Sequence, residues 1–388
     1  MQQKWAIGLP TDEYSTDYQC ESPIGILGDW LYFAVPDHSV TRIYVIHKET
    51  GDGVYRSPRR IHAPLPHDYI FLSYGDMAIL YTEYLFFFRG DTLIKKLPVQ
   101  DKGQVESHLL YGDTLYLVCN RGRIRTIETV DLKTQEWSQS LDISQSIFYR
   151  PGPLSLCGNW ITCYGRDQLL FIDPEELTIS HSLSLPRITK LFCPIPLDED
   201  TLLIGYTNGT NAGLLKYSTA TKKILWRHKR KFEGPQLKCK FYLHKGKALW
   251  VKNERELIAV DVETGEEAYS VPTLPWAYTD LRFEGDRILY GTAGANGYLN
   301  CIHSETGEKL WSVYLQNGCA YYDIWQDHAY VGDFSGAIKK ISLQDGTIVE
   351  EHPVGGAVVG QHKISDGSLY TVLWANDQNP IRLVKISL

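Results

Sequence analysis

The chain has 388 residues, of which 43% are hydrophobic and 22% are charged, as in ordinary globular proteins. These values exclude a disordered, collagen-like or coiled-coil chain. The 39 Lys and Arg residues and 46 Asp and Glu residues give a net charge of −7, which disfavours a nucleic-acid-binding surface. The 25 Tyr against 2 Met favour β-strands over helices.

The N-terminus predicts a cytoplasmic protein. It lacks a basic segment followed by a long apolar segment, so no secretory signal is expected. The densest apolar stretch, Met77 to Phe88, is interrupted by Glu83 and is too short to span a membrane. The eight Cys residues are scattered, without a C-x-x-C pair, and we expect most of them to be free, buried thiols.

Short turns rich in Gly and Asp recur along the chain at intervals of about 37 to 47 residues. This is the period of a four-stranded propeller blade. An apolar strand follows each turn, so each turn marks one repeat unit. Nine turns of this kind lie at 28–30, 75–77, 112–114, 158–160, 199–201, 245–247, 285–287, 326–328 and 366–368.

A second turn, of the type Asp-x-x-Thr-Gly-Glu, follows later in most units. Its clearest copies are in 257–269 and 299–311, and both lead into a strand that carries Tyr or Trp. Asp accepts hydrogen bonds from nearby main-chain N–H groups, and Gly adopts the positive φ that reverses the chain. Related copies lie at 43–55, 129–137, 172–179, 214–226 and 338–350.

The repeats predict an all-β fold, a β-propeller of four-stranded antiparallel blades. Nine units are counted, with eight as the fallback because propellers typically carry four to eight blades. If one unit is irregular, the short second unit is the one suspected. The last unit ends at 381–388 without an outer strand, whereas the chain opens with 4–10, which resembles an unpaired outer strand. Pairing these two segments would close the ring and remove exposed sheet edges. No linker composition interrupts the chain, so residues 1–388 are predicted to form one domain.

The runs 260–269 and 306–311, Val-Asp-Val-Glu-Thr-Gly-Glu-Glu-Ala-Tyr and Thr-Gly-Glu-Lys-Leu-Trp, resemble the repeat of the quinoprotein-type, or PQQ-like, β-propeller family. The resemblance implies four antiparallel strands per blade. It does not imply quinone binding, because cofactor-free scaffolds share the repeat. The chain has no adjacent Cys-Cys pair and no evident calcium-ligand cluster, so a non-dehydrogenase member without a cofactor is expected.

Two further segments could carry a function. The run 222–231 is the densest basic stretch of the chain and could bind an acidic partner, although a solvated outer strand protected by lysines is the favoured interpretation. The run 291–297 is rich in Gly but lacks the Lys-Ser/Thr ending and the following helix of a phosphate-binding loop.

No catalytic or metal-binding motif is evident. The twelve His residues are dispersed, and no H-E-x-x-H or G-x-S-x-G pattern occurs. His67-Asp68 and Tyr322-Asp323 each place a carboxylate beside a polar ring, but the sequence cannot show whether catalytic groups from different blades converge. No catalytic, cofactor-binding or metal-binding residue is therefore assigned.

Aromatic residues and Arg recur in the segments that should connect one blade to the next. Such residues dominate protein-binding surfaces because they bury much area at a small entropy cost. We predict that a partner protein contacts Tyr149, Arg150, Trp276, Tyr278, Tyr321 and Tyr322.

The predicted function is a non-catalytic protein-binding module that acts as a scaffold, an adaptor or an inhibitor of the immunity-protein type. The alternative is an enzyme that acts on a sugar or another small molecule in the central funnel, with a quinone-dependent oxidoreductase as a special case. Convergent Asp, Glu, His or Arg side chains in a deep polar pocket would support the enzyme.

Overall fold

The structure is a computed structural model of the 388-residue chain. It describes residues 1–9, 24–37, 40–56, 70–81, 84–147, 152–165, 168–184, 190–191, 194–208, 211–231, 241–252, 255–273, 279–292, 296–316, 318–333, 335–358, 362–374 and 381–388.

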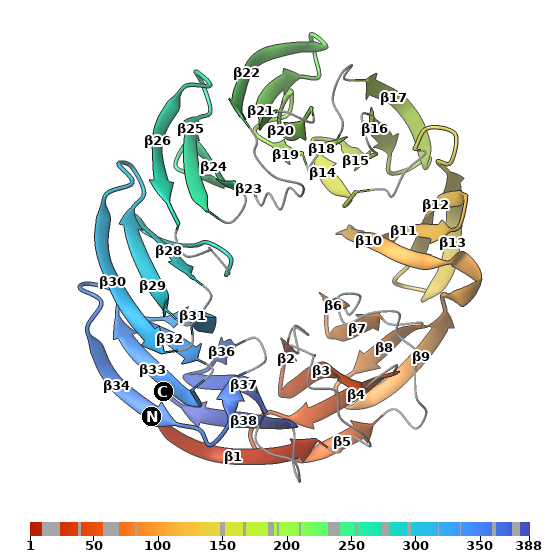
Figure 1. The fold of residues 1–388 in the computed structure, drawn as a ribbon. Coiled ribbons are helices and arrows are strands. Elements are labelled where there is room, and N and C mark those ends of the chain that lie inside the picture. The colour runs from red at the N-terminus through yellow and green to blue at the C-terminus, as the bar shows by residue number, and fades with distance from the viewer. Residues whose placement is uncertain are drawn as a thin grey trace. The chain divides into compact units, whose positions relative to one another are not determined.

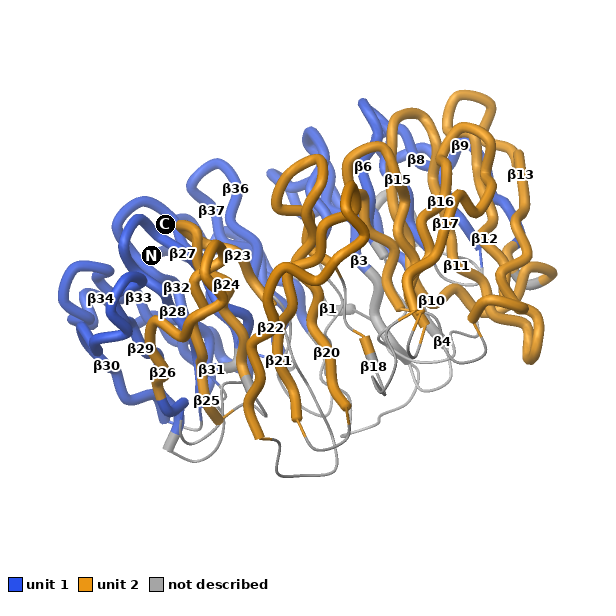
Figure 2. The backbone as a smooth tube through the Cα atoms, turned by 90° about the horizontal axis from the view of Figure 1, so that it is seen from above, with its two compact units in different colours: residues 1–98, 272–388 blue, residues 99–271 orange. Residues whose placement is uncertain are grey.

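The described residues form nine antiparallel sheets and one short 3-10 helix, in two compact units (Figure 2). Unit 1 contains residues 1–98 and 272–388, and unit 2 contains residues 99–271. The prediction of a single domain stays a prediction.

Unit 1 holds five of the sheets. Their strands are β1 (Gln2–Leu9), β2 (Gly25–Leu27), β3 (Trp30–Asp37), β4 (Val40–His47), β5 (Gly53–Arg56), β6 (Ile70–Tyr74), β7 (Met77–Tyr81), β8 (Tyr84–Arg89), β9 (Thr92–Pro98), β27 (Arg282–Glu284), β28 (Arg287–Gly291), β29 (Asn296–His303), β30 (Lys309–Gln316), β31 (Cys319–Trp325), β32 (His328–Asp333), β33 (Ala337–Ser342), β34 (Ile348–Pro353), β35 (Ala357–Val358), β36 (Lys363–Ser365), β37 (Ser368–Trp374) and β38 (Ile381–Ser387).

Unit 2 holds the other four sheets. Its elements are η2 (Gln100–Lys102), β10 (Gln104–Tyr111), β11 (Thr114–Arg121), β12 (Ile124–Asp131), β13 (Glu136–Asp142), β14 (Ser155–Cys157), β15 (Trp160–Tyr164), β16 (Gln168–Asp173), β17 (Thr178–Ser184), β18 (Lys190–Leu191), β19 (Ile195–Pro196), β20 (Thr201–Thr207), β21 (Asn211–Ser218), β22 (Lys223–Lys231), β23 (Phe241–His244), β24 (Lys247–Lys252), β25 (Glu256–Asp261) and β26 (Glu267–Pro272).

Each sheet is a blade, and the fold is an all-β propeller of nine four-stranded blades. In eight blades the strands follow one another in sequence, whereas the C-terminal blade takes β1 as its outer strand. The predicted number of blades is confirmed, and the fallback of eight is not needed. The short second unit forms the regular sheet β6-β7-β8-β9, so the suspicion that it is irregular is wrong. The first strand is instead divided in two other blades, where β18 and β19 both pair with β20, and β35 and β36 both pair with β37.

The position of a strand within its blade decides its hydrophobic pattern. The third strand β8 is buried along Leu85–Phe88, because a middle strand is covered on both faces. The outer strand β30 alternates buried and exposed residues from Trp311 onward, because one of its faces meets water. Turns between first and second strands place Gly at positive φ, as at Gly28 with φ 59° and Gly285 with φ 58°.

The N-terminal strand completes the C-terminal blade, as the sequence predicts. β1 pairs antiparallel with β38, with Gln2 opposite Ser387 and Leu9 opposite Ile381, and the two strands run side by side in Figure 1. β1 is thus the outer strand of the blade that β35, β36, β37 and β38 begin. This pairing covers the edge of β38, which would otherwise present unpaired main-chain groups.

Candidate partner-binding surface

The structure describes two of the six residues predicted to contact a partner. Tyr149 and Arg150, and likewise Trp276 and Tyr278, lie outside the described residues. Tyr321 and Tyr322 lie on β31, the first strand of its blade.

Tyr322 joins neighbouring blades of unit 1. Its side chain is 6% exposed, and its hydroxyl oxygen lies 2.9 Å from the main-chain oxygens of both Asp280 and Leu289. Tyr321 is partly buried and packs against the apolar cluster that includes Tyr330 and Leu369. Little of the Tyr322 ring is available to a partner, whereas the half-buried Tyr321 retains exposed surface.

Asp323, the carboxylate beside Tyr322, holds main chain in place. Its Oδ2 accepts a hydrogen bond of 3.1 Å from the N–H of Ile364, on the divided first strand of the next blade. Its Oδ1 accepts a hydrogen bond of 3.0 Å from the N–H of Ile324. Both contacts position strands, so the Tyr322-Asp323 pair has a structural role in unit 1.

A tryptophan on the outer strand contacts the turn of the following blade in both units. In unit 2, Trp226 Nε1 donates to the Val262 carbonyl at 2.9 Å, and its ring covers Gly265. A Cβ atom on Gly265 would lie only 2.6 Å from the indole, so this turn needs glycine for close approach as well as for its φ of 75°. In unit 1, Trp311 Nε1 donates to the Leu343 carbonyl at 3.1 Å.

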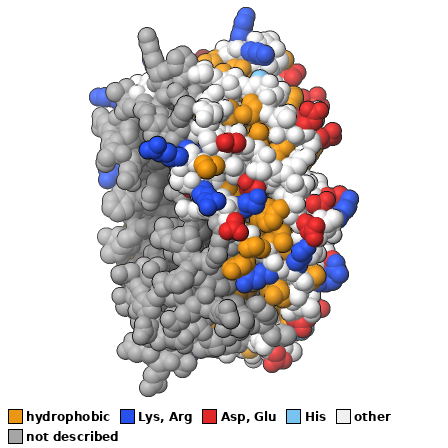
Figure 3. Space-filling model, turned by 90° about the vertical axis from the view of Figure 1, so that its right-hand side faces the viewer, with side chains coloured by type: hydrophobic (Ala, Val, Ile, Leu, Met, Phe, Trp, Pro, Cys, Tyr) orange, Lys and Arg blue, Asp and Glu red, His pale blue; other side chains and the backbone are white. Residues whose placement is uncertain are grey.

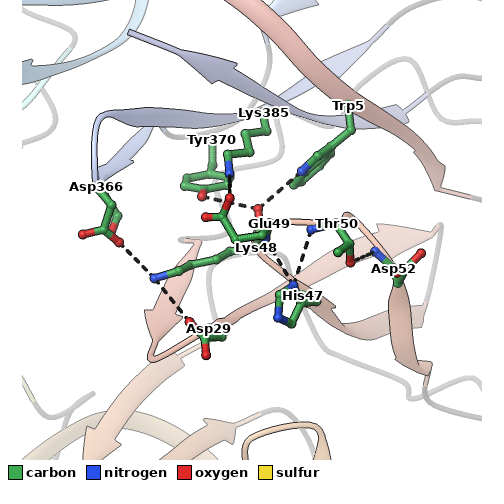
Figure 4. A network of polar contacts seen from close by, with 11 residues as sticks. Trp5, Asp29, His47, Lys48, Glu49, Thr50, Asp52, Asp366, Tyr370 and Lys385 are labelled. Atoms are coloured by element: carbon green, nitrogen blue, oxygen red, sulfur yellow. Dashed lines mark hydrogen bonds and ion pairs between the residues drawn. The ribbon is translucent and has the colours of Figure 1, made fainter.

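The same contact recurs where the N-terminal strand meets the turn between β4 and β5 (Figure 4). Trp5 Nε1 donates to the Lys48 carbonyl at 3.3 Å, and the Tyr370 hydroxyl approaches that oxygen at 3.5 Å. Because a carbonyl oxygen has two lone pairs, it can accept both hydrogen bonds. β1 is therefore held by β38 on one side and by this turn through its tryptophan.

A lysine on the third strand pairs with a glutamate of the following turn at two equivalent positions. Lys385 Nζ lies 2.7 Å from Glu49 Oε2, and Lys216 Nζ lies 2.8 Å from Glu263 Oε2. The Lys385 side chain is 6% exposed, so its ammonium group needs this partner. The hydrogen bond from Lys385 lowers the pKa of Glu49 below its usual value.

Beside it, Lys48 donates to Asp366 at 2.9 Å, and this hydrogen bond raises the pKa of Lys48 and lowers that of Asp366 (Figure 4). The network joins the C-terminal blade to the blade of β2–β5 within unit 1. The sequence analysis missed these lysine–glutamate pairs, although a signal exists. This signal is a lysine near the end of a third strand, followed in the next repeat by a Glu-Thr-Gly turn. Lys216 is such a lysine, and Glu263 begins such a turn.

A polar pocket of about 450 Å³ opens beside the Lys385–Glu49 pair. Its volume is within the usual range for small-molecule sites, but charged and hydroxyl groups dominate its lining. It is lined by Lys4, Trp5, Glu49, Thr50, Ser368, Lys385 and Ser387. The equivalent place beside β10–β13 in unit 2 holds a pocket of about 280 Å³.

Buried ionisable groups elsewhere are engaged in the fold. Asp333 is 0% exposed and accepts a hydrogen bond of 2.6 Å from Lys339, which also lies 3.4 Å from Glu351. Burial raises the pKa of the Cys119 and Cys301 thiols to about 12, so they are protonated and poorly nucleophilic.

All five cysteines in the described residues are free and buried, as predicted. Cys20, Cys193 and Cys239 lie outside those residues.

The described residues show neither a membrane-crossing helix nor a ligand cluster for a metal. No helix among them is long and apolar enough to cross a membrane. Within the same residues, no three His, Cys, Asp or Glu side chains gather where a metal ion could bind. On the face drawn in Figure 3, side chains of both charges are interspersed with hydrophobic ones.

Comparison with known proteins supports the PQQ-like repeat. Residues 210–377 match the family described as outer membrane protein assembly factor BamB. Residues 210–377 therefore carry the PQQ-like repeat.

Among curated proteins, the dehydrogenase subunit of a quinone alcohol dehydrogenase from Acetobacter aceti is 27% identical over 142 residues. The match covers 31% of this chain but only 19% of that protein, so the chain spans about a fifth of the relative's length.

Solved structures of low sequence identity share the fold. BamB from Moraxella catarrhalis has a TM-score of 0.56 and 16% identity, over 83% of this chain and 97% of that chain. The computationally designed Ika8 protein has a TM-score of 0.53 and 11% identity, over 95% and 97%. A europium-containing methanol dehydrogenase has a TM-score of 0.55 and 8% identity, over 100% and 93%. At such identities the likeness concerns the fold alone.

Proposed function

We propose that this chain is a non-catalytic protein-binding module, acting as a scaffold, an adaptor or an inhibitor. The observation that carries the proposal is the match of 210–377 to a family described as an outer membrane protein assembly factor. The described polar groups fit this role, because Tyr322, Asp323 and Asp333 bind main chain or neighbouring side chains of the fold itself. The preformed blades would present a surface to a partner at little cost in ordering.

The proposed contact residues are Tyr149, Arg150, Trp276, Tyr278 and Tyr321, whereas Tyr322 is buried. The test is capture of a partner by the wild-type protein and by Trp276→Ala and Tyr321→Ala variants. Val349→Ala is the matched control, since Val349 lies on outer strand β34 with 55% exposure. We expect the two aromatic variants to lose the partner and the control to keep it. Equal capture by all four proteins would disprove the surface.

Quinone-dependent oxidation is the second candidate, and the 27% identity to the quinone alcohol dehydrogenase subunit favours it. A metal such as the europium of the methanol dehydrogenase would need several oxygen-bearing side chains close together. The described residues do not fit this need, because they bring no three such ligands together. Titration with quinone and metal, followed by absorbance, tests this candidate, and an unchanged spectrum would exclude it.

A cytoplasmic location is part of the proposal. The five free, buried cysteines support it, since free thiols are typical of reducing compartments. Fractionation of cells with an antibody to the protein tests the location, and recovery in the periplasm or the medium would refute it.

A further inference from the structure

The outer strand β22 is an unusual sheet edge. It spans Lys223–Lys231 and, with nine residues, is the longest strand in the described part of the chain. It is the last strand of its sheet, and its second edge pairs with no other described strand. The favoured sequence interpretation, an outer strand in contact with solvent, is therefore correct for its place in the fold.

The face of β22 toward the next blade is neutralised within unit 2. Trp226 donates to the Val262 carbonyl at 2.9 Å. Arg230 Nε donates to Glu267 Oε2 at 2.8 Å, and His228 Nε2 lies 3.3 Å from the same oxygen. These contacts anchor β22, and they engage the carboxylate of Glu267 on this face.

The opposite face carries a row of positive charge. Arg227, Lys229 and Lys231 alternate along the strand and are exposed. Among the described residues, no carboxylate forms an ion pair with Arg227 or Lys229. Leu225, at the bulge that begins this row, is 51% exposed. Like charges at alternate positions of one strand lie on the same face and repel each other.

This concentration of positive charge contrasts with the net charge of the whole chain, which is −7. Charged side chains, lysine above all, protect a sheet edge against self-association. Three cations in a row, with an exposed leucine beside them, also complement a strand that carries acidic residues and an aliphatic residue. Opposite charges facing each other across two strands contribute roughly 0.2–1 kcal/mol per pair.

We propose that β22 binds an extended acidic segment of a partner protein, which adds to the sheet as a further antiparallel strand. The segment carries Asp or Glu at alternate positions, opposite Lys231, Lys229 and Arg227, and an aliphatic residue opposite Leu225. Main-chain hydrogen bonds to the edge of β22 that pairs with no other described strand provide affinity, and the charges set the register. The inference rests on the proposed protein-binding function but uses residues other than the aromatic ones.

The test is fluorescence anisotropy with a labelled peptide of alternating glutamate and threonine that ends in valine. We expect saturable binding that weakens with salt and weakens at least tenfold in the triple variant Arg227→Gln, Lys229→Gln, Lys231→Gln. The matched control is Lys4→Gln, Lys309→Gln, Lys363→Gln, which removes the same charge from exposed sites of unit 1. It should change the affinity less than twofold.

Three further measurements separate strand addition from other binding. The same peptide with N-methylated alternate amides keeps its charge but cannot pair with β22, and we expect it not to bind. Anionic phosphatidylglycerol vesicles and a single-stranded oligonucleotide should compete at least tenfold more weakly than the unlabelled peptide. No saturable binding, equal binding of the N-methylated peptide, or equal competition by either polyanion would overturn the proposal. The Trp276→Ala variant should bind the peptide normally, so failure of the aromatic surface is distinguishable from failure at β22.

Discussion

His362 should make the stability of the protein depend on pH between pH 6.5 and pH 3. The side chain is 6% exposed between β35 and β36, and its Nδ1 lies 2.9 Å from Thr371 Oγ1. Its Nε2 is buried with no hydrogen-bond partner among the described residues. Burial lowers the pKa of His362 to about 3.

The direction of the pH dependence follows from the pKa of His362 in the unfolded and folded states. The unfolded chain binds a proton at His362 with a pKa of about 6.5, whereas the folded chain does not until about pH 3. The unfolded state therefore binds more protons in this range, and the free energy of unfolding falls as the pH falls. The stabilisation is present above pH 6.5 and declines progressively down to about pH 3. Between pH 8 and pH 5, the loss is about 2 kcal/mol.

The assay is urea unfolding, followed by fluorescence at pH 8, 6.5 and 5, of the wild type and of His362→Asn. Asn cannot titrate here but can still form a hydrogen bond with Thr371. His352→Asn is the control, because it removes a histidine that is only partly buried. We expect the wild type and the control to lose about 2 kcal/mol more than His362→Asn. Parallel pH dependence in all three proteins would refute the reasoning.

Three other outcomes test the contacts between blades and the buried thiols. Trp311→Ala should lower the free energy of unfolding by about 3–5 kcal/mol, because it removes a buried ring and its hydrogen bond to the Leu343 carbonyl. Chemical unfolding measures this change, and a loss below about 1 kcal/mol would contradict the contact. Gly265→Ala should destabilise by about 1–3 kcal/mol, because its Cβ would meet Trp226 and because its φ is 75°. In a Trp226→Ala background the cost of the clash should vanish while the cost of the positive φ remains, so full additivity would contradict the clash. Cys163 and Cys319 should resist iodoacetamide at pH 8 in the native protein, because burial raises the pKa of both thiols. Both should react after unfolding, as mapped by mass spectrometry. Rapid labelling of the native protein would be inconsistent with their burial.

The architecture could be predicted from sequence because each blade repeats the same local chemistry. Gly28 and Gly285 each mark a turn between first and second strands, and counting such turns gives the number of blades. The pairing of β1 with β38 was also predictable, because the sequence begins with an unmatched outer strand and its last repeat unit lacks an outer strand.

The candidate site was less predictable, because aromatic residues have the same sequence pattern whether they face solvent or a neighbouring sheet. Tyr322 follows Tyr321 directly, yet its hydroxyl lies between two main-chain oxygens and its ring is buried. Lys385 and Glu49 are far apart in sequence, and their ion pair depends on how two blades meet. Local patterns identify strands and turns, whereas these contacts depend on tertiary packing.

The pairing of Gln2 with Ser387 also sets a limit on folding during synthesis. β1 leaves the ribosome before every other described strand of this sequence, and its partner β38 is made hundreds of residues later. At about 5–20 residues per second, the wait lasts roughly 20–80 s. Throughout that time β1 is a nascent strand without its sheet, and its exposed Gln2, Gln3 and Lys4 are suited to keeping it in water until β38 emerges.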